Sequence, residues 1–257
     1  MLAADWSTFE FDYLLDMSRL VPHLVALEAH KDAARVAALP PDWLEPPASR
    51  AWSWVEERFI PGSQPLSVSD LLTIHQMVAD DSGLEAEPHG AFRTGPVRVG
   101  RPSVGGFHEG APPEQLFVLM ARYVEFIDTA PVRTLPPVIT ALLAHFFLDT
   151  IHPFPDGNGR TSRLAAAAVL SRGGYRLHGS YALVRHFYHH ALTYHKLLQQ
   201  SWQRCPFDVT AFIAFGIEGV IAELRSVEAF LRMKRYRISD SEHGALAMGR
   251  RMASRLS

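Results

Sequence analysis

Residues 152–163 read HPFPDGNGRTSR, and their types and spacing suit the binding and transfer of phosphate groups. Two prolines keep the chain extended, and Gly157 and Gly159 then permit unusual backbone angles and the close approach of a ligand. We expect a helix to begin directly after this loop. Its first N–H groups have no partner within the helix and would face the loop, where they can bind an anion.

Charged side chains in the same stretch strengthen this interpretation. Arg160 and Arg163 fall in the first turn of the expected helix, where the helix dipole disfavours each cation by up to ~1 kcal/mol. An anionic ligand would remove that penalty and accept bidentate contacts. Asp156 could hold Mg²⁺, and His152 could act as a general base near neutral pH. Together these residues predict a phosphoryl- or nucleotidyl-transfer site.

A purely structural explanation exists for each of these residues taken singly. The stretch would then be a helix–loop–helix turn, with arginines paired to surface acids and a capping histidine. Glycine, arginine and aspartate at these offsets share no packing reason, however. We therefore favour transfer chemistry for the set as a whole.

Helices must position this loop. Apolar residues predict helices on both sides of it, over 137–150 and 159–172, with Gly173 and Gly174 ending the second. The same periodicity predicts further helices over 20–38, 48–59, 67–79, 113–128, 183–202 and 208–236.

One region departs from the helical pattern. Glycines and prolines cluster between residues 89 and 113 around the alternation Val97-Arg98-Val99, which predicts a loop with a small β-hairpin, the only strand signal in the chain. Residues after 232 are expected to form a frayed basic tail. The predicted fold class is all-α with one short β-hairpin.

Composition excludes several classes of protein. Lys and Arg number 25 against 27 Asp and Glu, which disfavours a surface devoted to nucleic acid. The single cysteine, Cys205, excludes an internal disulfide and a cysteine-rich zinc site. The N-terminal residues lack a secretory signal pattern, and no apolar stretch is long enough to span a bilayer. We therefore expect a cytoplasmic protein without membrane contacts.

Other catalytic motifs are not supported. None of the lysines follows a glycine, so a Walker A loop is excluded, and no G-x-S-x-G elbow occurs. Four histidines lie close in sequence, but without an H-E-x-x-H pattern a metal site is not favoured. They are His186, His189, His190 and His195.

Residues 152–163 resemble the signature of the Fic family, HxFx[D/E]GNGRxxR. Every specified position matches: His152, Phe154, Asp156, Gly157, Asn158, Gly159, Arg160 and Arg163. Residues 67–75, 90–100 and 145–152 are also similar to family segments, the second containing the pattern G-x-[YF]-R-x-x-x-V. The resemblance covers about residues 60 to 231.

The resemblance implies an all-helical Fic-type core that transfers AMP from ATP to a Ser, Thr or Tyr hydroxyl of a target protein, with Mg²⁺. By analogy, His152 would deprotonate the hydroxyl, which attacks the α-phosphate and displaces pyrophosphate, and Asp156 would bind the metal. The remaining motif residues would bind phosphate: Gly157, Asn158 and Gly159 as an anion hole, and Arg160 and Arg163 at the β- and γ-phosphates. Phe154 would instead anchor the loop in the core.

The resemblance also suggests three more distant sites. Gly105, Gly106 and Phe107 would belong to a flap that aligns a target segment by main-chain pairing. Tyr194 would contact the adenine. Many relatives carry an inhibitory helix, [S/T]xxxE[G/N], for which Glu28 is the best candidate, with Arg163 as its partner; Leu24 and Ala29 depart from the pattern.

A second, poorer match to the inhibitory helix runs from Ser53 to Glu57. The expected organisation is an N-terminal helical extension (1–60), a Fic domain (61–231) and a basic tail (232–257). ATP and a target protein would be the partners, with self-modification and a homodimer as further options. Alternatives on the same fold are the transfer of UMP, phosphocholine or phosphate, and removal of AMP. A non-enzymatic nucleotide-binding regulator is a third, which the intact His152 disfavours.

Overall fold

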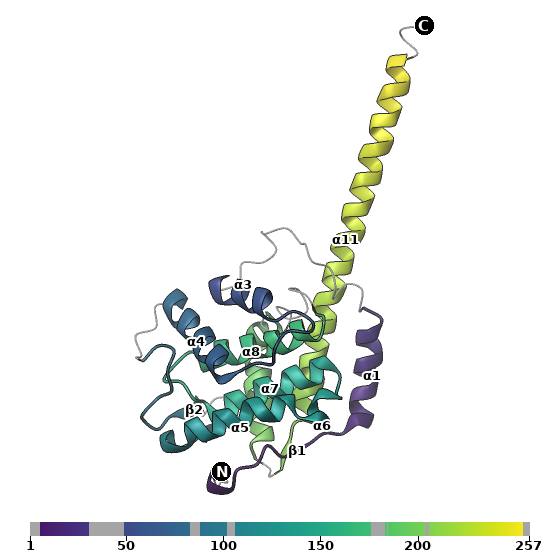
Figure 1. The fold of residues 1–257 in the computed structure, drawn as a ribbon. Coiled ribbons are helices and arrows are strands. Elements are labelled where there is room, and N and C mark those ends of the chain that lie inside the picture. Colours follow the sequence, from purple (N-terminus) through teal and green to yellow (C-terminus); the bar gives the residue numbers. More distant parts are fainter. Residues whose placement is uncertain are drawn as a thin grey trace.

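Helix α7 (Pro137–Ile151) lies at the centre of the fold in a computed structural model of the chain (Figure 1). The structure describes residues 6–30, 49–82, 88–101, 106–175, 183, 185–203 and 206–253. Every α7 residue from Val138 to Ile151 is buried, as expected of a helix that is apolar on nearly all sides. The loop that follows its C-terminal end therefore starts within the core, and Asp156 is the exposed residue among 152–158.

Helix α8 (Asn158–Arg172) packs along α7 and follows it after a short loop. Its middle consists of four consecutive alanines, 165–168, all fully buried. Small side chains let the two helix backbones approach closely, which fixes the ends of the loop between them.

Other helices enclose this pair. Helices α3 (Ser49–Arg58) and α4 (Val68–Ser82) pack on α8, whereas α5 (Leu116–Asp128) packs on α7. Further helical elements among the described residues are η1 (Trp6–Thr8), α1 (Met17–Glu28), η4 (Pro113–Gln115), α6 (Ala130–Arg133), α10 (Ala191–Ser201) and α11 (Thr210–Ala253). Residues 183 and 185–189 are also helical. Helix α1 lies against α11, whose C-terminal part extends well beyond the other helices (Figure 1).

The predicted hairpin is confirmed. Strands β2 (Arg98–Arg101) and β3 (Gly106–Glu109) pair antiparallel, with Arg98 opposite Glu109 and Arg101 opposite Gly106. The all-α class with one short hairpin is thus correct.

The expectation of a single strand region was wrong. A two-residue parallel pair joins β1 (Tyr13–Leu14) to β4 (Phe207–Asp208). Two residues are too few to show an alternating pattern, so no local signal marks these strands. Tyr13 of β1 and Phe207 of β4 both pack against Phe147 in the aromatic core, which brings the two strands together.

Two helix predictions also need correction. The helix expected over 183–202 is interrupted at His190, whose φ of −116° and ψ of 36° precede α10. The expected frayed tail continues α11 as helix to Ala253. No proline occurs after Thr210, so nothing forces the backbone out of the helix, which crosses the predicted domain boundary at 231 without a break. The domain division itself stays a prediction.

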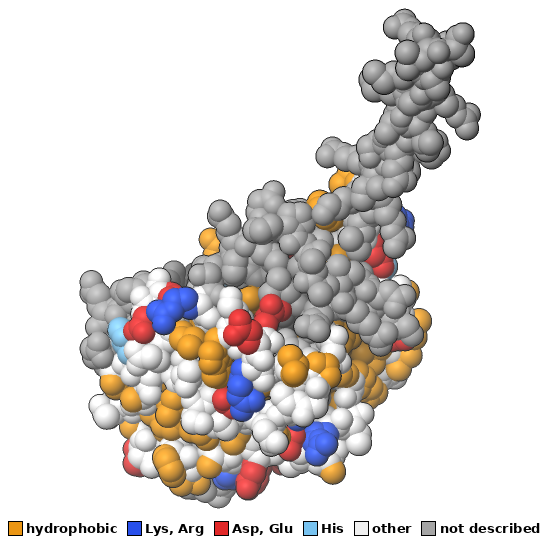
Figure 2. All heavy atoms as spheres, turned by 45° about the horizontal axis from the view of Figure 1, so that its top comes forward, with side chains coloured by type: hydrophobic (Ala, Val, Ile, Leu, Met, Phe, Trp, Pro, Cys, Tyr) orange, Lys and Arg blue, Asp and Glu red, His pale blue; other side chains and the backbone are white. Residues whose placement is uncertain are grey.

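Charged side chains are interspersed on the face drawn in Figure 2. Lys and Arg side chains lie singly, close to Asp and Glu, and do not gather into a basic patch there. Within the described residues, no helix combines the length and apolar character needed to cross a membrane.

Candidate active site

The loop begins with an unusual backbone conformation at His152. This residue caps α7 with φ 53° and ψ 61°, and it is the one non-glycine residue with positive φ in the described ranges. Its N–H donates to Leu148 O at 2.9 Å, which completes the last turn of α7. The left-handed conformation costs roughly 1–2 kcal/mol, and such strain is concentrated at functional sites.

The half-buried His152 ring is oriented by the same turn. Its Nδ1 lies 3.3 Å from Asp149 O, so Nδ1–H donates to this carbonyl and Nε2 is left as the proton acceptor. Burial lowers the pKa of His152, and the nearby Arg93 charge lowers it further, although Asp149 and Asp156 oppose them. The imidazole is therefore neutral at pH 7 and can act as a base.

Beneath His152, the buried carboxylate of Asp149 accepts two hydrogen bonds from side chains. Tyr194 Oη donates to Asp149 Oδ2 at 2.7 Å, and Ser162 Oγ donates to Oδ1 at 3.2 Å. Because the Tyr194 proton points at Asp149, its oxygen accepts from His145 Nε2–H at 2.9 Å. Burial alone would raise the pKa of Asp149, but His145, His152, Tyr194 and Arg163 together lower it. The network joins α7, α8 and α10 below the loop.

The burial and hydrogen bonds of Tyr194 do not fit the expected contact with adenine. Its side chain is 4% exposed, and its ring packs against Phe187 at 4.8 Å between centroids. Its hydroxyl is used by Asp149 and His145. Tyr194 is therefore a core residue that supports the loop from below, a role the helical spacing could not distinguish from ligand binding.

Asn158 braces the loop internally. Its Oδ1 accepts from Phe154 N–H at 2.9 Å, and its Nδ2 donates to Phe154 O at 2.8 Å. Both polar atoms of the amide are thus committed to the backbone, so an anion hole here would be formed by backbone N–H groups. Phe154 is fully buried and its ring stacks on His75 at 3.9 Å, which confirms it as the core anchor.

The two glycines perform different tasks. Gly157 adopts φ +74° and provides no side-chain cap at the start of α8, so the first N–H groups of the helix remain available to a ligand. A Cβ on Gly159 would lie 3.3 Å from Arg163 Nη1. A side chain at residue 159 would therefore push the Arg163 guanidinium from its place.

Arg160 and Arg163 form no ion pair in the described part of the chain, although the Arg163 charge acts over a longer distance on the Asp149 carboxylate. Both are half-buried, and in the described part of the chain neither guanidinium has a carboxylate within ion-pair distance or a hydrogen-bond acceptor. The alternative of a turn whose arginines pair with surface acids therefore finds no support in the described residues. Two arginines without an ion pair in this part of the chain, near the positive end of α8, are an anion-binding arrangement.

Asp156 lies exposed at the tip of the loop. Its Oδ1 accepts from Gly157 N–H, and its carbonyl accepts from His75 Nε2–H at 3.0 Å. The described residues contain no group of three or more His, Cys, Asp or Glu that could hold a metal ion. A metal here would depend on one carboxylate together with water and ligand oxygens, which is a common environment for Mg²⁺.

The predicted flap residues fall partly within the described structure. Gly106 and Phe107 begin β3, opposite Arg101 and Gly100, and Gly105 lies outside the described residues. Because the sheet has two strands, β3 keeps a backbone edge that is not paired within it.

The expected pairing of Glu28 with Arg163 is not present. Glu28 ends α1, is exposed, and acts electrostatically on Tyr175 beyond the C-terminal end of α8. Arg163 lies in the first turns of α8, roughly 14 Å from that end at 1.5 Å per residue. Because α1 packs on α11, it does not bring Glu28 to the loop.

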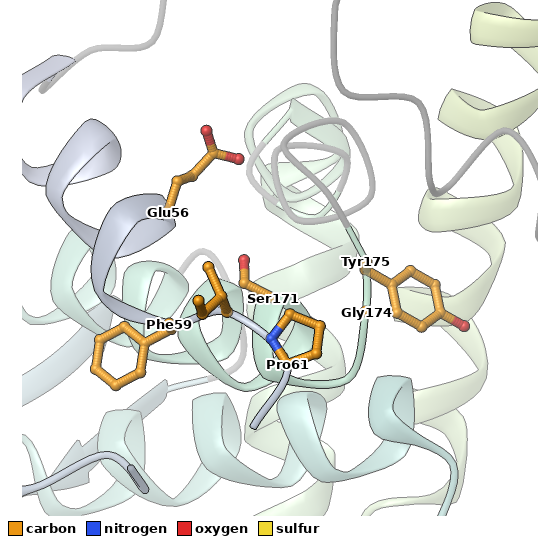
Figure 3. Close-up of a pocket in the computed structure, with 7 residues that line it drawn as sticks. Glu56, Phe59, Pro61, Ser171, Gly174 and Tyr175 are labelled. Atoms are coloured by element: carbon orange, nitrogen blue, oxygen red, sulfur yellow. The ribbon is translucent and has the colours of Figure 1, made fainter. Parts of the chain in front are cut away.

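The second candidate for an inhibitory helix, α3, also ends away from the loop. Its Glu56 lines a small surface pocket together with Pro61, Ser171 and Gly174 at the C-terminal end of α8 (Figure 3). No residue of the 152–163 loop lines this pocket. The neighbouring Glu57 is exposed.

Several residues that support the site have no role predicted from the sequence: His75, Arg93, His108 and Asp149. A usable signal did exist for Asp149, because it and His145 are polar residues four apart in an otherwise apolar helix. His75 could not be recognised in this way, since its ring Nδ1 accepts from Gly90 N–H, a contact between distant segments.

Comparisons with known proteins agree with this geometry. Residues 65–170 match the model of the Fic/DOC family. "Protein adenylyltransferase Fic" of Drosophila erecta is 38% identical over 110 residues, covering 43% of this chain and 21% of that protein. The protein of the same name from Drosophila melanogaster gives the same values. The chain thus spans about a fifth of the length of these curated relatives.

Solved structures show the same fold. A Fic family protein from Desulfovibrio desulfuricans G20 aligns with a TM-score of 0.60 at 20% identity, covering 82% of this chain and 64% of that one. Fic-1 (residues 134–508) from C. elegans aligns with a TM-score of 0.51 at 18% identity, covering 87% and 69%.

Proposed function

We propose that this chain, which matches the model of the Fic/DOC family over residues 65–170, is a protein adenylyltransferase that transfers AMP from ATP to a hydroxyl side chain of a target protein. The arrangement that carries the proposal is a neutral imidazole, His152, at one end of the loop and two arginines without an ion pair among the described residues, Arg160 and Arg163, at the start of the helix that follows it. A binding module would need the arginines but no base. The match to relatives named protein adenylyltransferase supports AMP as the transferred group.

In the proposed reaction, His152 Nε2 accepts the proton of the target hydroxyl. The hydroxyl oxygen then forms a bond to the α-phosphorus of ATP, while the bond from this phosphorus to the oxygen that bridges to the β-phosphate breaks. Pyrophosphate leaves with the electron pair of that bond. The hydrogen bond from Nδ1–H to Asp149 O keeps Nε2 directed outward as the acceptor.

The phosphates would lie over the start of α8. Backbone N–H groups after Gly157 and the guanidinium groups of Arg160 and Arg163 can then donate to the phosphate oxygens and stabilise the developing charge. The exposed Asp156 carboxylate would hold Mg²⁺, which neutralises phosphate charge when bound. A target segment would pair with the free edge of β3, as an added strand.

The test is transfer of label from ATP to protein. The wild-type chain and the variant His152→Ala are each incubated with Mg²⁺, a cell lysate and ATP labelled at either the α- or the γ-phosphate. His189→Ala, which alters an exposed histidine outside the loop, is the matched control. We expect α-label on protein with wild type and control, and none with His152→Ala.

Other outcomes would contradict the proposal in distinct ways. Protein labelled from γ-labelled ATP alone would indicate phosphate transfer. Labelling by UTP in preference to ATP would indicate transfer of UMP. ATP binding without labelling would indicate a regulator or the reverse reaction.

A further inference from the structure

Arg93 is a buried arginine that binds three backbone segments. It is 5% exposed, and its guanidinium donates from Nε to His152 O at 2.8 Å, from Nη1 to Gly95 O at 2.6 Å, and from Nη2 to Ala111 O. No carboxylate lies within ion-pair distance of it among the described residues. A buried cation is unfavourable unless its donors are satisfied, and here carbonyl oxygens satisfy them.

The three carbonyls belong to segments that meet at the base of the β2–β3 hairpin. Gly95 precedes β2, Ala111 follows β3, and His152 begins the loop. Backbone bonds reinforce the junction, because Arg93 N–H donates to Pro153 O at 3.0 Å and Ala111 N–H donates to Ile151 O at 3.0 Å. The base of the hairpin is thus bonded directly to the turn that carries the proposed base.

Gly110 shows how close this contact is. A Cβ at Gly110 would lie 3.2 Å from His152 Cβ, 3.0 Å from Arg93 Nη2 and 2.7 Å from Val97 Cγ1. A side chain at residue 110 would therefore force Val97, Arg93 or His152 to shift.

A second side chain joins the hairpin to α7. His108, on β3, donates from Nε2–H to Thr150 O at 2.7 Å. Its ring stacks on Trp202 with centroids 4.2 Å apart, and Trp202 Nε1–H donates to Thr150 Oγ1 at 2.8 Å. His108 is 6% exposed, so this contact lies inside the protein, two residues before His152.

We propose that Arg93 and His108 are positioning residues that hold the β2–β3 hairpin and His152 as one preassembled unit. The inference rests on the proposed function, in which β3 aligns the target segment. With the hairpin fixed to both sides of the His152 turn, a hydroxyl presented along β3 reaches His152 Nε2 in a constant geometry. A displacement of about 1 Å can lower a reaction rate roughly 10²-fold, so this coupling would determine target modification more than ATP binding.

The test compares Arg93→Met with Arg98→Met. Arg98 is an arginine on β2 that is 63% exposed and pairs with Glu109, so its variant alters the same hairpin without touching the junction. Amide hydrogen exchange is measured at Gly110, which donates to Val97 O, and at Ala111. We expect exchange at both amides to accelerate about tenfold or more in Arg93→Met only, while amides within α7 and α8 remain protected.

Two further measurements separate positioning from general damage. The imidazole NMR signals of His152 should shift in Arg93→Met and remain in place in Arg98→Met, while those of the distant His23 stay unchanged in both. In the transfer assay, kcat for target modification should fall roughly 10²-fold in Arg93→Met with little change in KM for ATP. Arg93→Lys, which keeps the charge but not the planar fork of donors, should recover only part of the rate.

Unchanged exchange at Gly110 and Ala111, with unchanged His152 signals, would overturn the proposal whatever the activity. An equal loss of ATP binding and transfer would also overturn it, since it would indicate a merely structural role. If the wild-type chain transfers no AMP, the exchange and NMR measurements still show whether Arg93 holds the β2–β3 hairpin to His152. If Arg93→Met does not fold, His108→Gln is measured in the same way, with acceleration expected at Gly106–Glu109.

Discussion

The hydroxyl of Tyr194 donates a hydrogen bond to Asp149 Oδ2 over 2.7 Å and thereby ties α10 to the last turn of α7. Asp149 O in turn orients His152. A side chain on one helix thus supports the proposed base on another without contacting the ligand side of the loop.

This relationship leads to the first prediction. Tyr194→Phe should lower the free energy of unfolding by about 1–3 kcal/mol, because the buried Asp149 carboxylate loses a donor. ATP affinity should change little, since Tyr194 is buried below the loop. Urea unfolding and nucleotide titration measure the two effects. Weakened ATP binding with unchanged stability would instead restore the expected adenine contact.

Arg163 should contribute to both stability and binding. Its charge helps to lower the pKa of the buried Asp149 carboxyl, so Arg163→Gln should lower the stability of the ligand-free protein by up to ~1 kcal/mol. The same change should weaken ATP binding, because a phosphate contact is lost. Thermal unfolding with and without ATP checks this. Arg232→Gln, altering an exposed arginine on α11, should change neither quantity.

The pH dependence of transfer should follow the neutral form of His152. Burial lowers the pKa of His152 below its ordinary value of 6.5, so the imidazole is already deprotonated at pH 7. The rate should therefore be flat around pH 7 to 8 and decline only below about pH 6.5 as Nε2 becomes protonated. Initial rates of labelling across this range test it. A rate that keeps rising from pH 7 to 8 would require a different base.

Acid should destabilise the fold through its buried histidines. Burial lowers the pKa of both His108 and His145 to about 4. Between pH 6.5 and 4 the unfolded chain therefore binds protons that the folded chain does not, and stability falls as pH falls. The slope should be on the order of 1 kcal/mol per pH unit for each histidine. Urea unfolding at pH 7 and pH 5 measures it, and His145→Gln should flatten the dependence.

Glu28→Gly should leave transfer activity unchanged. The carboxylate lies near Tyr175, at the end of α8 that is remote from Arg163, so removing it frees no phosphate contact. Self-labelling and target labelling by wild type and variant are compared at equal concentration. An increase in the variant would mean that α1 reaches the loop in another conformation.

The sequence by itself determined the helices on either side of the 152–163 loop and predicted phosphate-transfer chemistry for the loop. These signals are local: glycines that permit unusual backbone angles, arginines one helical turn apart, and the periodicity of α7 and α8 lie within one continuous stretch. The hairpin was equally visible, because turn residues and a short alternation mark it. The two-residue strands β1 and β4 are too short to show such an alternation, and they were therefore not predicted.

Only the tertiary structure decided which polar groups face the loop and which support it. Residue type alone suggested ligand-binding or regulatory roles for Tyr194, Asn158 and Glu28. In the structure, however, Tyr194 and Asn158 are buried in the protein core. Glu28 lies near the C-terminal end of α8, remote from Arg163. Arg93 and His108 act through carbonyls of residues far along the chain. Hydrogen bonds between such distant segments depend on how the helices pack, and no spacing along the sequence records them.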